Sequence, residues 1–163
     1  MGRVGNKRSD HRWRAPDGTI WPSELEYNVY AACLQDERIN VRACDERDTF
    51  SYATKVRSGR CTECGSSQCV QDRTYQPDLY IWTTDEDNGF FVEVKGFMRA
   101  SRRSQIAALL RQSPTLDLRF VIGSSKTRAT KKLLMWEYIE KYYKRPWIEW
   151  SGQLPETWIN DTK

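Results

Sequence analysis

The chain has 163 residues and a mass of 19.2 kDa, which suits a single domain of ordinary size. Hydrophobic residues make up 39% of the sequence, enough to build one core, so the composition excludes a wholly disordered chain. Lysine and arginine outnumber aspartate and glutamate by 26 to 22, and they gather in a few segments, which favours a polyanionic partner. No apolar run approaches the roughly 20 residues of a membrane helix, and the first residues lack the hydrophobic stretch of a secretory signal. We therefore expect a cytoplasmic protein without membrane contact, whose five cysteines stay reduced.

The N-terminal part is predicted to form an arm followed by a helix. Residues 1–22 are basic and rich in turn formers, and they are expected to become an ordered loop around Trp13 and Trp21. Ser23 fits an N-cap with Glu26 as its capping-box partner, and the apolar spacing that follows predicts a helix over 24–36.

The remaining elements alternate strands and helices. Short strands are expected over 39–44 and 49–56, before an insertion rich in Gly, Ser and Cys at 58–71. Strands 78–82 and 90–95 flank the acidic turn 85–89 and are expected to form a hairpin. After these we expect a helix over 101–112, a strand over 118–122, a helix over 131–143, a strand over 147–150 and a polar tail. This order predicts an α/β fold with a central mixed sheet flanked by helices.

The strand 90–95 carries the strongest functional signal. Its period of two places Glu93 and Lys95 on one face, while the alternate residues turn into a core. Asp78 opens the other strand of the hairpin, so pairing of the strands can bring its carboxylate close to Glu93. Two carboxylates and an ammonium suit phosphodiester hydrolysis with Mg²⁺ or Mn²⁺, and Glu26 can add a further ligand. The alternative is a surface salt bridge between Glu93 and Lys95.

A resemblance to a known family strengthens the nuclease hypothesis. The segments that carry it are 23–26, 75–78, 91–96, 116–119, 124–127 and 154–159. In order and spacing they resemble the PD-(D/E)XK nucleases, in particular Holliday-junction resolvases of the phage endonuclease I type. The resemblance implies a restriction-endonuclease-like core and a nuclease domain over 23–159, with 160–163 as a tail. It also implies a phage protein that acts in the host cytoplasm.

The same resemblance assigns roles to residues. Asp78 and Glu93 would bind the catalytic metal, Lys95 would assist the nucleophile, and Glu26 would complete the site, with Glu24 as its rival. The family forms homodimers that exchange strands, so Glu26 would serve the active site of the second copy. The cysteine-rich insertion departs from the family pattern and puts this strand exchange in doubt.

Cysteines in and before the insertion have the spacing of a zinc site. Cys61 and Cys64 form a Cys-x2-Cys knuckle, Cys69 follows five positions later, and Cys44 precedes them by seventeen. Four thiolates at such spacings can bind a structural Zn²⁺. The alternatives are His11 in place of Cys44, or reduced cysteines without a metal.

Basic residues in three segments are candidates for phosphate contacts, although a solvated surface explains any single one of them equally well. They are Arg8, Arg12, Arg99, Arg102, Arg103, Lys126 and Arg128. The expected activity is that of a Mg²⁺-dependent, junction-resolving DNA endonuclease. The alternative is a homing endonuclease of the same fold that cuts a defined duplex sequence. A non-catalytic, zinc-containing DNA-binding module and an RNA-binding protein are the hypotheses from other classes.

Overall fold

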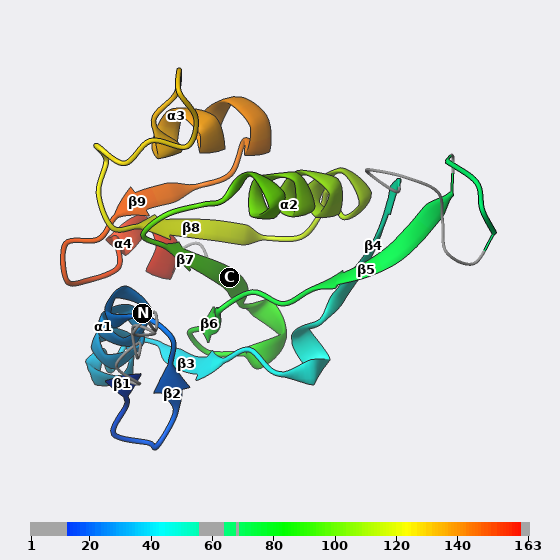
Figure 1. Ribbon diagram of the computed structural model, residues 1–163. Coiled ribbons are helices and arrows are strands. Elements are labelled where there is room, and N and C mark those ends of the chain that lie inside the picture. The colour runs from blue at the N-terminus through cyan, green and yellow to red at the C-terminus, as the bar shows by residue number, and fades with distance from the viewer. Residues whose placement is uncertain (1–12, 56–63, 68, 161–163) are drawn as a thin grey trace, which may run out of the picture.

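A mixed five-stranded sheet forms the centre of the protein, in a computed structural model that describes residues 13–55, 64–67 and 69–160 (Figure 1). The strand order is β3-β6-β7-β8-β9. Neighbours are antiparallel from β3 to β7 and parallel from β7 to β9. The bounds of the five strands are Asn40–Ala43, Leu79–Trp82, Phe90–Lys95, Leu118–Ile122 and Trp147–Glu149. The predicted mixed sheet is therefore confirmed.

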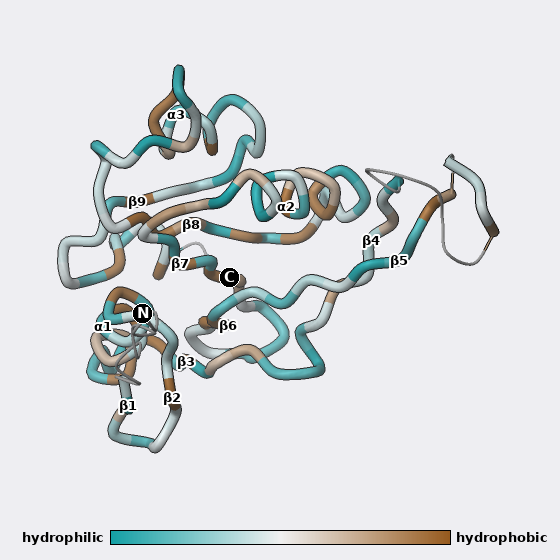
Figure 2. The backbone as a smooth tube through the Cα atoms, viewed as in Figure 1, coloured by the Kyte–Doolittle hydropathy of each residue, from teal (hydrophilic) through white to brown (hydrophobic). Residues whose placement is uncertain are grey.

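Helices cover both faces of this sheet (Figure 1). One core joins α1 (Glu24–Gln35) and α4 (Glu156–Asn160) to the inward side chains of β7, namely Phe90, Val92 and Val94. A second core lies on the opposite face, where α2 (Ala100–Gln112) packs on β8 with α3 (Met135–Tyr138) and the π-helix η3 (Ile139–Tyr143). Figure 2 shows the hydrophobic stretches along β8 and α2 between these layers. None of the described helices is long and apolar enough to cross a membrane.

The predicted first helix is observed almost as expected. Ser23 Oγ accepts a hydrogen bond from the Glu26 amide, and the buried Cys33 lies in the core as predicted. The Glu26 carboxylate does not complete a capping box, because it turns toward Lys95 instead. The hairpin of β1 (Trp13–Arg14) and β2 (Ile20–Trp21) packs on α1 through its two tryptophans, which explains the ordered loop expected there.

The predicted helix over 131–143 is wrong in its first turn. Thr130 Oγ1 accepts hydrogen bonds from the amides of Lys132 and Leu133, and Ala129 bonds to Leu133 across a turn. A threonine that bonds to the backbone just ahead of it offers those amides an alternative to helix. The helix therefore begins at Met135, once the turn has closed.

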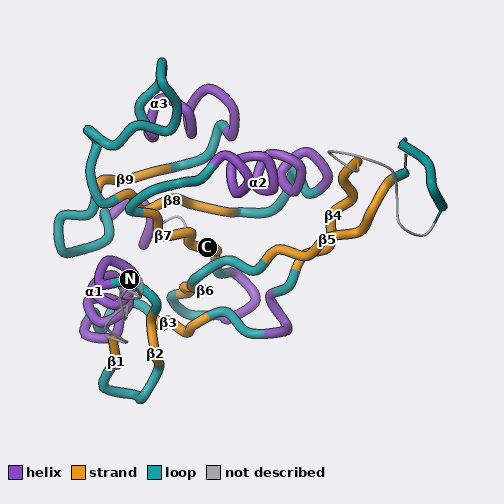
Figure 3. Tube along the Cα trace, in the orientation of Figure 1, coloured by secondary structure: helices purple, strands orange, loops and turns teal. Residues whose placement is uncertain are grey.

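The cysteine-rich segment belongs to a two-stranded ribbon that the sequence reasoning recognised only in part. Strand β4 (Phe50–Lys55) was expected, whereas β5 (Val70–Tyr75), which pairs with it in antiparallel register, was not: its first two residues were assigned to the insertion and the other four to no element. Strand β5 was missed because it consists mainly of polar residues. The ribbon projects away from the central sheet (Figures 1 and 3). The helical turn α4 was also missed, because it lies in a segment read as a polar tail.

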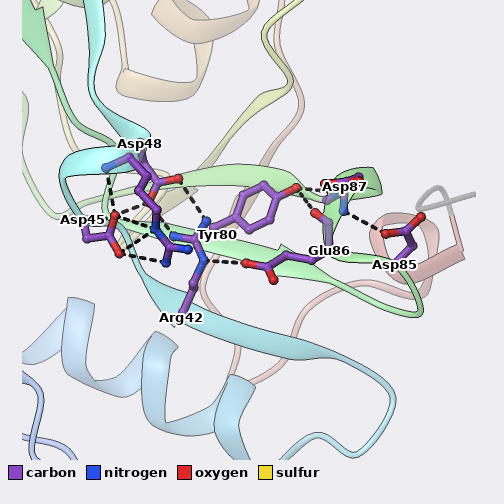
Figure 4. Close-up of polar contacts among 9 residues, drawn as sticks. Arg42, Asp45, Asp48, Tyr80, Asp85, Glu86 and Asp87 are labelled. Atoms are coloured by element: carbon purple, nitrogen blue, oxygen red, sulfur yellow. Dashed lines mark hydrogen bonds and ion pairs between the residues drawn. The ribbon is translucent and has the colours of Figure 1, made fainter.

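An ion-pair network secures the base of this ribbon. Arg42 on β3 contacts Asp48 in the turn η1 (Glu46–Asp48) and Glu86 in the turn η2 (Glu86–Asn88) (Figure 4). Its guanidinium also lies 4.7 Å from the centroid of the Tyr80 ring. Asp48 is buried, and it accepts a second hydrogen bond from the Asp45 amide. One arginine thus ties the ribbon to the β6–β7 hairpin.

Candidate active site

The carboxylate of Asp78 is held between two strands of the sheet. The Asp78 carbonyl accepts from the Cys44 amide at 3.0 Å, and the Asp78 amide donates to the Val92 carbonyl at 3.1 Å. With the backbone fixed in this way, the side-chain Oδ2 accepts from the Val94 amide at 2.7 Å and from Lys95 Nζ at 3.1 Å. The approach expected from the hairpin is therefore observed.

Lys95 gathers the other two predicted acids around the same point. Its Nζ lies 3.0 Å from Glu93 Oε1 and 3.8 Å from Glu26 Oε1. Glu93 is fully buried and Glu26 almost so, while Glu24, two positions earlier in the same helical turn, is exposed. All four predicted residues therefore meet within one chain, so Glu26 does not need to reach a second copy. The geometry also favours Glu26 over its rival Glu24.

A second cation holds Glu93 from the opposite side. Arg102, near the start of α2, contacts Glu93 Oε1 at 3.2 Å through Nη2, and its guanidinium lies 4.2 Å from the centroid of the buried Tyr75 ring. Arg102 was predicted as a phosphate contact, and its observed partner is a site carboxylate. Tyr75 was not identified at all as a site residue, although it lies three positions before Asp78, in a segment that carries the resemblance.

Burial shifts the protonation of this cluster. Desolvation, reinforced by the neighbouring Glu93 and Glu26 charges, raises the pKa of Asp78 to about 7. Burial by itself would lower the pKa of Lys95, but Glu93 and Asp78 more than offset it, and the pKa of Lys95 rises above its ordinary value. At neutral pH Lys95 therefore stays charged and can donate hydrogen bonds, whereas it cannot accept a proton.

The Asp78 shift predicts how stability depends on pH in the absence of divalent metal. Because the folded pKa of about 7 exceeds the ordinary value of 3.8, the folded state holds the proton more tightly, and stability should fall between about pH 4 and pH 7. We expect this loss to be on the order of a few kcal/mol. Urea unfolding across this range should show the decline, and Asp78→Asn should flatten it. Asp72→Asn, on the exposed part of β5, is the control. An unchanged decline in Asp78→Asn would contradict the assignment.

The donor set fits a hard divalent cation. When all three are ionised, the carboxylates of Glu26, Asp78 and Glu93 exceed the two cations Lys95 and Arg102 by one negative charge. Glu26 Oε2 and Glu93 Oε2 are buried and have no hydrogen-bond partner among the residues that the structure describes, and such atoms are costly unless a ligand satisfies them. Among the described residues, no three acidic, histidine or cysteine side chains already form a metal-binding group. Small side-chain adjustments would therefore have to accompany metal binding.

Comparison with known proteins adds an independent observation. The chain is 33% identical over 97 residues to Endonuclease I of Escherichia phage T7. The similarity supports a nuclease. The match covers 58% of this chain and 59% of the phage protein, so the chain spans less than two thirds of this relative. No protein-family model matches the chain.

The predicted phosphate contacts of this nuclease candidate fall into two groups. Arg99, Lys126 and Arg128 are exposed, whereas Arg103 is used internally, because it donates to the Met98 carbonyl and lies over the Tyr138 ring. Two further candidates, Arg8 and Arg12, lie outside the described residues. Lys126 and Arg128 lie in the loop after β8. In this loop the Ser125 amide is not available to a phosphate, because it already donates a hydrogen bond to Glu149 Oε1.

An aromatic side chain next to the site went unnoticed in the sequence. Phe97 lies two positions after Lys95 and is 63% exposed, which is unusual for a phenylalanine. The strand pattern ends at Lys95, so no periodicity indicated which way Phe97 would point.

The cysteines are not all brought together. Cys44 follows β3 beside Asp78, while Cys64 and Cys69 lie at the far end of the β4–β5 ribbon (Figure 1). Six residue pairs separate that end from the base, a length of about 20 Å. Cys44 is therefore too distant to act as the fourth zinc ligand. Cys61 and the alternative His11 lie outside the described residues.

Proposed function

We propose that the protein is a Mg²⁺-dependent DNA endonuclease with a restriction-endonuclease-like core. The observation that carries this proposal is the convergence of Glu26, Asp78, Glu93 and Lys95 on one point of a single chain. The similarity to a phage endonuclease supports the same reaction class. The basic excess of the sequence supports a nucleic acid as substrate.

In this proposal each residue has a distinct task. Asp78 and Glu93 would hold the divalent metal with help from Glu26, and Mn²⁺ should substitute for Mg²⁺. When bound, such a metal neutralises charge on the scissile phosphate and activates water. Lys95 stays protonated and donates to the oxygen that becomes negatively charged during hydrolysis. Arg102 contacts Glu93 Oε1 and would hold the rotamer of Glu93.

We place branched DNA first among the substrates, with a homodimer as the acting form. The similarity to Endonuclease I supports this choice. Because the four candidate residues meet within one chain, a homodimer would carry two sites, one for each of two DNA strands. Four-way DNA junctions and linear duplexes of matched sequence, incubated with the protein and Mg²⁺, test the choice. Cuts that flank the branch point in any sequence support a junction-resolving enzyme, and the absence of any cut in either substrate would contradict the endonuclease proposal.

One observation favours the alternative, a homing endonuclease that cuts a defined duplex sequence. The β4–β5 ribbon projects from the body (Figure 3), and the major groove of B-DNA admits a two-stranded ribbon. Exposed side chains along it, among them Ser51, Asp72 and Arg73, can reach base edges. A single reproducible cut in linear duplex, lost when these side chains are replaced, would support this alternative.

Glu26 and Glu24 provide a matched test of the metal site. We expect Glu26→Gln to raise the Mg²⁺ concentration needed for half-maximal cleavage by about tenfold to a hundredfold, because it removes one charged ligand of the metal. Glu24→Gln removes the same charge from the exposed face of the same helical turn and should leave cleavage unchanged. Titration of cleavage with Mg²⁺ provides the measurement. Equal effects of the two substitutions would contradict the assignment of Glu26.

A structural Zn²⁺ in the cysteine-rich segment remains a further proposal. Cys64 and Cys69 lie near one another in sequence at the far end of the ribbon, and the knuckle partner Cys61 lies outside the described residues. Metal analysis of the purified protein tests it. One zinc per chain in the wild type, lost in Cys64→Ser and retained in Cys44→Ser, would support a site that excludes Cys44.

A further inference from the structure

A hollow of about 460 Å³ lies beside the loop that follows β8, next to the π-helix η3. We call it the basic hollow. Its lining combines three lysines with one aromatic ring and contains no carboxylate; the residues are Thr130, Lys131, Lys132, Leu133, Lys141 and Tyr142. None of them belongs to the candidate active site, so the catalytic proposal leaves this basic surface unexplained.

One wall of the basic hollow is a tight turn that fixes two lysines at its tip. Thr130 Oγ1 accepts from the Lys132 amide at 3.2 Å and from the Leu133 amide at 3.0 Å. Arg128 donates to the Lys131 carbonyl at 3.3 Å. Since the backbone is already ordered, binding an anion here costs less conformational entropy than it would on a loose loop.

The other wall presents a ring with a cation over it. Tyr142 is 53% exposed, and Lys141 Nζ lies over its ring, 5.3 Å from the centroid. Tyr138 packs against the same ring at an angle of 43°, with 4.6 Å between centroids, so the ring is held in place by a neighbour. The π-helical turn that carries Lys141 and Tyr142 is a geometry found frequently at functional sites.

Nearby acids do not neutralise the basic hollow. Glu137 Oε2 accepts from the Leu134 amide at 2.7 Å, and Glu140 Oε1 accepts from Trp147 Nε1 at 2.9 Å. Over the stretches that the structure describes, no ion pair joins an acid to any of the three lysines. The local charge is therefore available to an external anion.

We propose that the basic hollow is a binding site for a single-stranded segment of DNA, in which the lysines contact successive phosphates and Tyr142 stacks on an unpaired base. Lysines alone would suit any phosphate backbone, but an exposed ring offers a stacking surface that bases inside a duplex cannot use. The loop that leads to the basic hollow starts beside the catalytic lysine, since the Gly123 amide donates to the Lys95 carbonyl at 3.2 Å. The choice of DNA as ligand rests on the proposed function.

The test measures binding without cleavage. Fluorescence anisotropy with a labelled oligodeoxynucleotide and a matched duplex is recorded in EDTA, so that its result does not depend on nuclease activity. We expect Lys131→Ser/Lys132→Ser to weaken single-strand binding about tenfold and to reduce the slope of log K against log salt by about 1.4. The control is Arg14→Ser/Arg111→Ser, which removes the same charge from exposed positions outside the basic hollow and the ribbon. It should leave the affinity within about twofold.

The aromatic part of the site is tested separately. Tyr142→Leu should weaken single-strand binding at least about fivefold, while Tyr142→Phe retains it, because stacking needs the ring and not the hydroxyl. The fluorescence of 2-aminopurine placed in the oligonucleotide should be quenched on binding to the wild type and to Tyr142→Phe, but not on binding to Tyr142→Leu. Any of three results would overturn the inference. The variants could lose equal affinity for duplex and single strand, they could lose no more affinity than the control, or the protein could bind the matched oligoribonucleotide more tightly than the oligodeoxynucleotide. Loss of cleavage alone bears on the proposed function and not on this site.

Discussion

Replacing Glu93 with Gln should lower the rate of DNA cleavage by at least about a hundredfold to a thousandfold while DNA binding persists. Glu93 is fully buried and lies within 3.2 Å of both Lys95 and Arg102, so the substitution removes the charge around which both cations are arranged. It also removes a metal ligand from the proposed site, where electrostatic stabilisation of the transition state is strongest. Single-turnover cleavage of labelled DNA at saturating Mg²⁺ measures the rate.

The control must separate lost chemistry from lost folding, because removing one partner of a buried ion pair is itself destabilising by about 3–5 kcal/mol. Near-ultraviolet circular dichroism and DNA binding in Ca²⁺ show whether Glu93→Gln is folded. Glu37→Gln removes an exposed carboxylate just after α1, outside the candidate site, and should cleave at the wild-type rate. A folded Glu93→Gln protein with undiminished cleavage would refute the proposed active site.

Truncating Arg119, which lies outside the candidate site, should cause a large loss of stability. The buried guanidinium lies 3.9 Å from the centroid of the Phe90 ring and 5.6 Å from that of Trp158. It also pairs with Asp117 at 2.8 Å. Arg119→Ala removes these contacts and leaves a cavity between β8 and α4, which should lower the free energy of unfolding by about 3 kcal/mol. Urea denaturation followed by tryptophan fluorescence provides the measurement.

Two further substitutions test the cause of this loss. Arg119→Lys should recover only part of the stability, because an ammonium cannot stack flat between two rings or bind a carboxylate in a bidentate manner. Arg111→Ala, on the exposed edge of α2, should change stability by no more than about 0.5 kcal/mol. If Arg119→Ala unfolds at the wild-type urea concentration, the packing argument fails.

The strand that carries Glu93 and Lys95 shows how much of the site could be predicted from the sequence. A period of two determines which side chains share a face, and the acidic turn before the strand determines its partner. These two local rules were sufficient to predict that Asp78 lies close to Glu93. In the structure both carboxylates contact Lys95, and Asp78 also accepts a hydrogen bond from the Val94 amide. The mixed sheet could be predicted in the same way, because the apolar residues of its strands indicate that the strands are buried.

Features that depend on contacts distant in sequence could not be predicted in this way. The role of Arg102 depends on how α2 lies across the sheet, and a helical pattern does not specify that position. Strand β5 is largely polar because it lies in a projecting ribbon rather than in the core, so no apolar alternation marks it. The start of α3 was misjudged because Thr130 diverts the amides that a helix would need.

The place where the ribbon leaves the sheet has an evolutionary consequence. The chain departs at Cys44 and returns at Asp78, and a backbone hydrogen bond of 3.0 Å joins these two residues. The pairing of β3 with β6 is therefore complete where the ribbon begins, and insertions or deletions in the outer part of the ribbon can be accommodated without moving the Asp78 carboxylate. Under the proposed function, such a gene could change its ribbon while the four residues of the candidate site stay in place, so that choice of DNA target and cleavage could diverge at different rates.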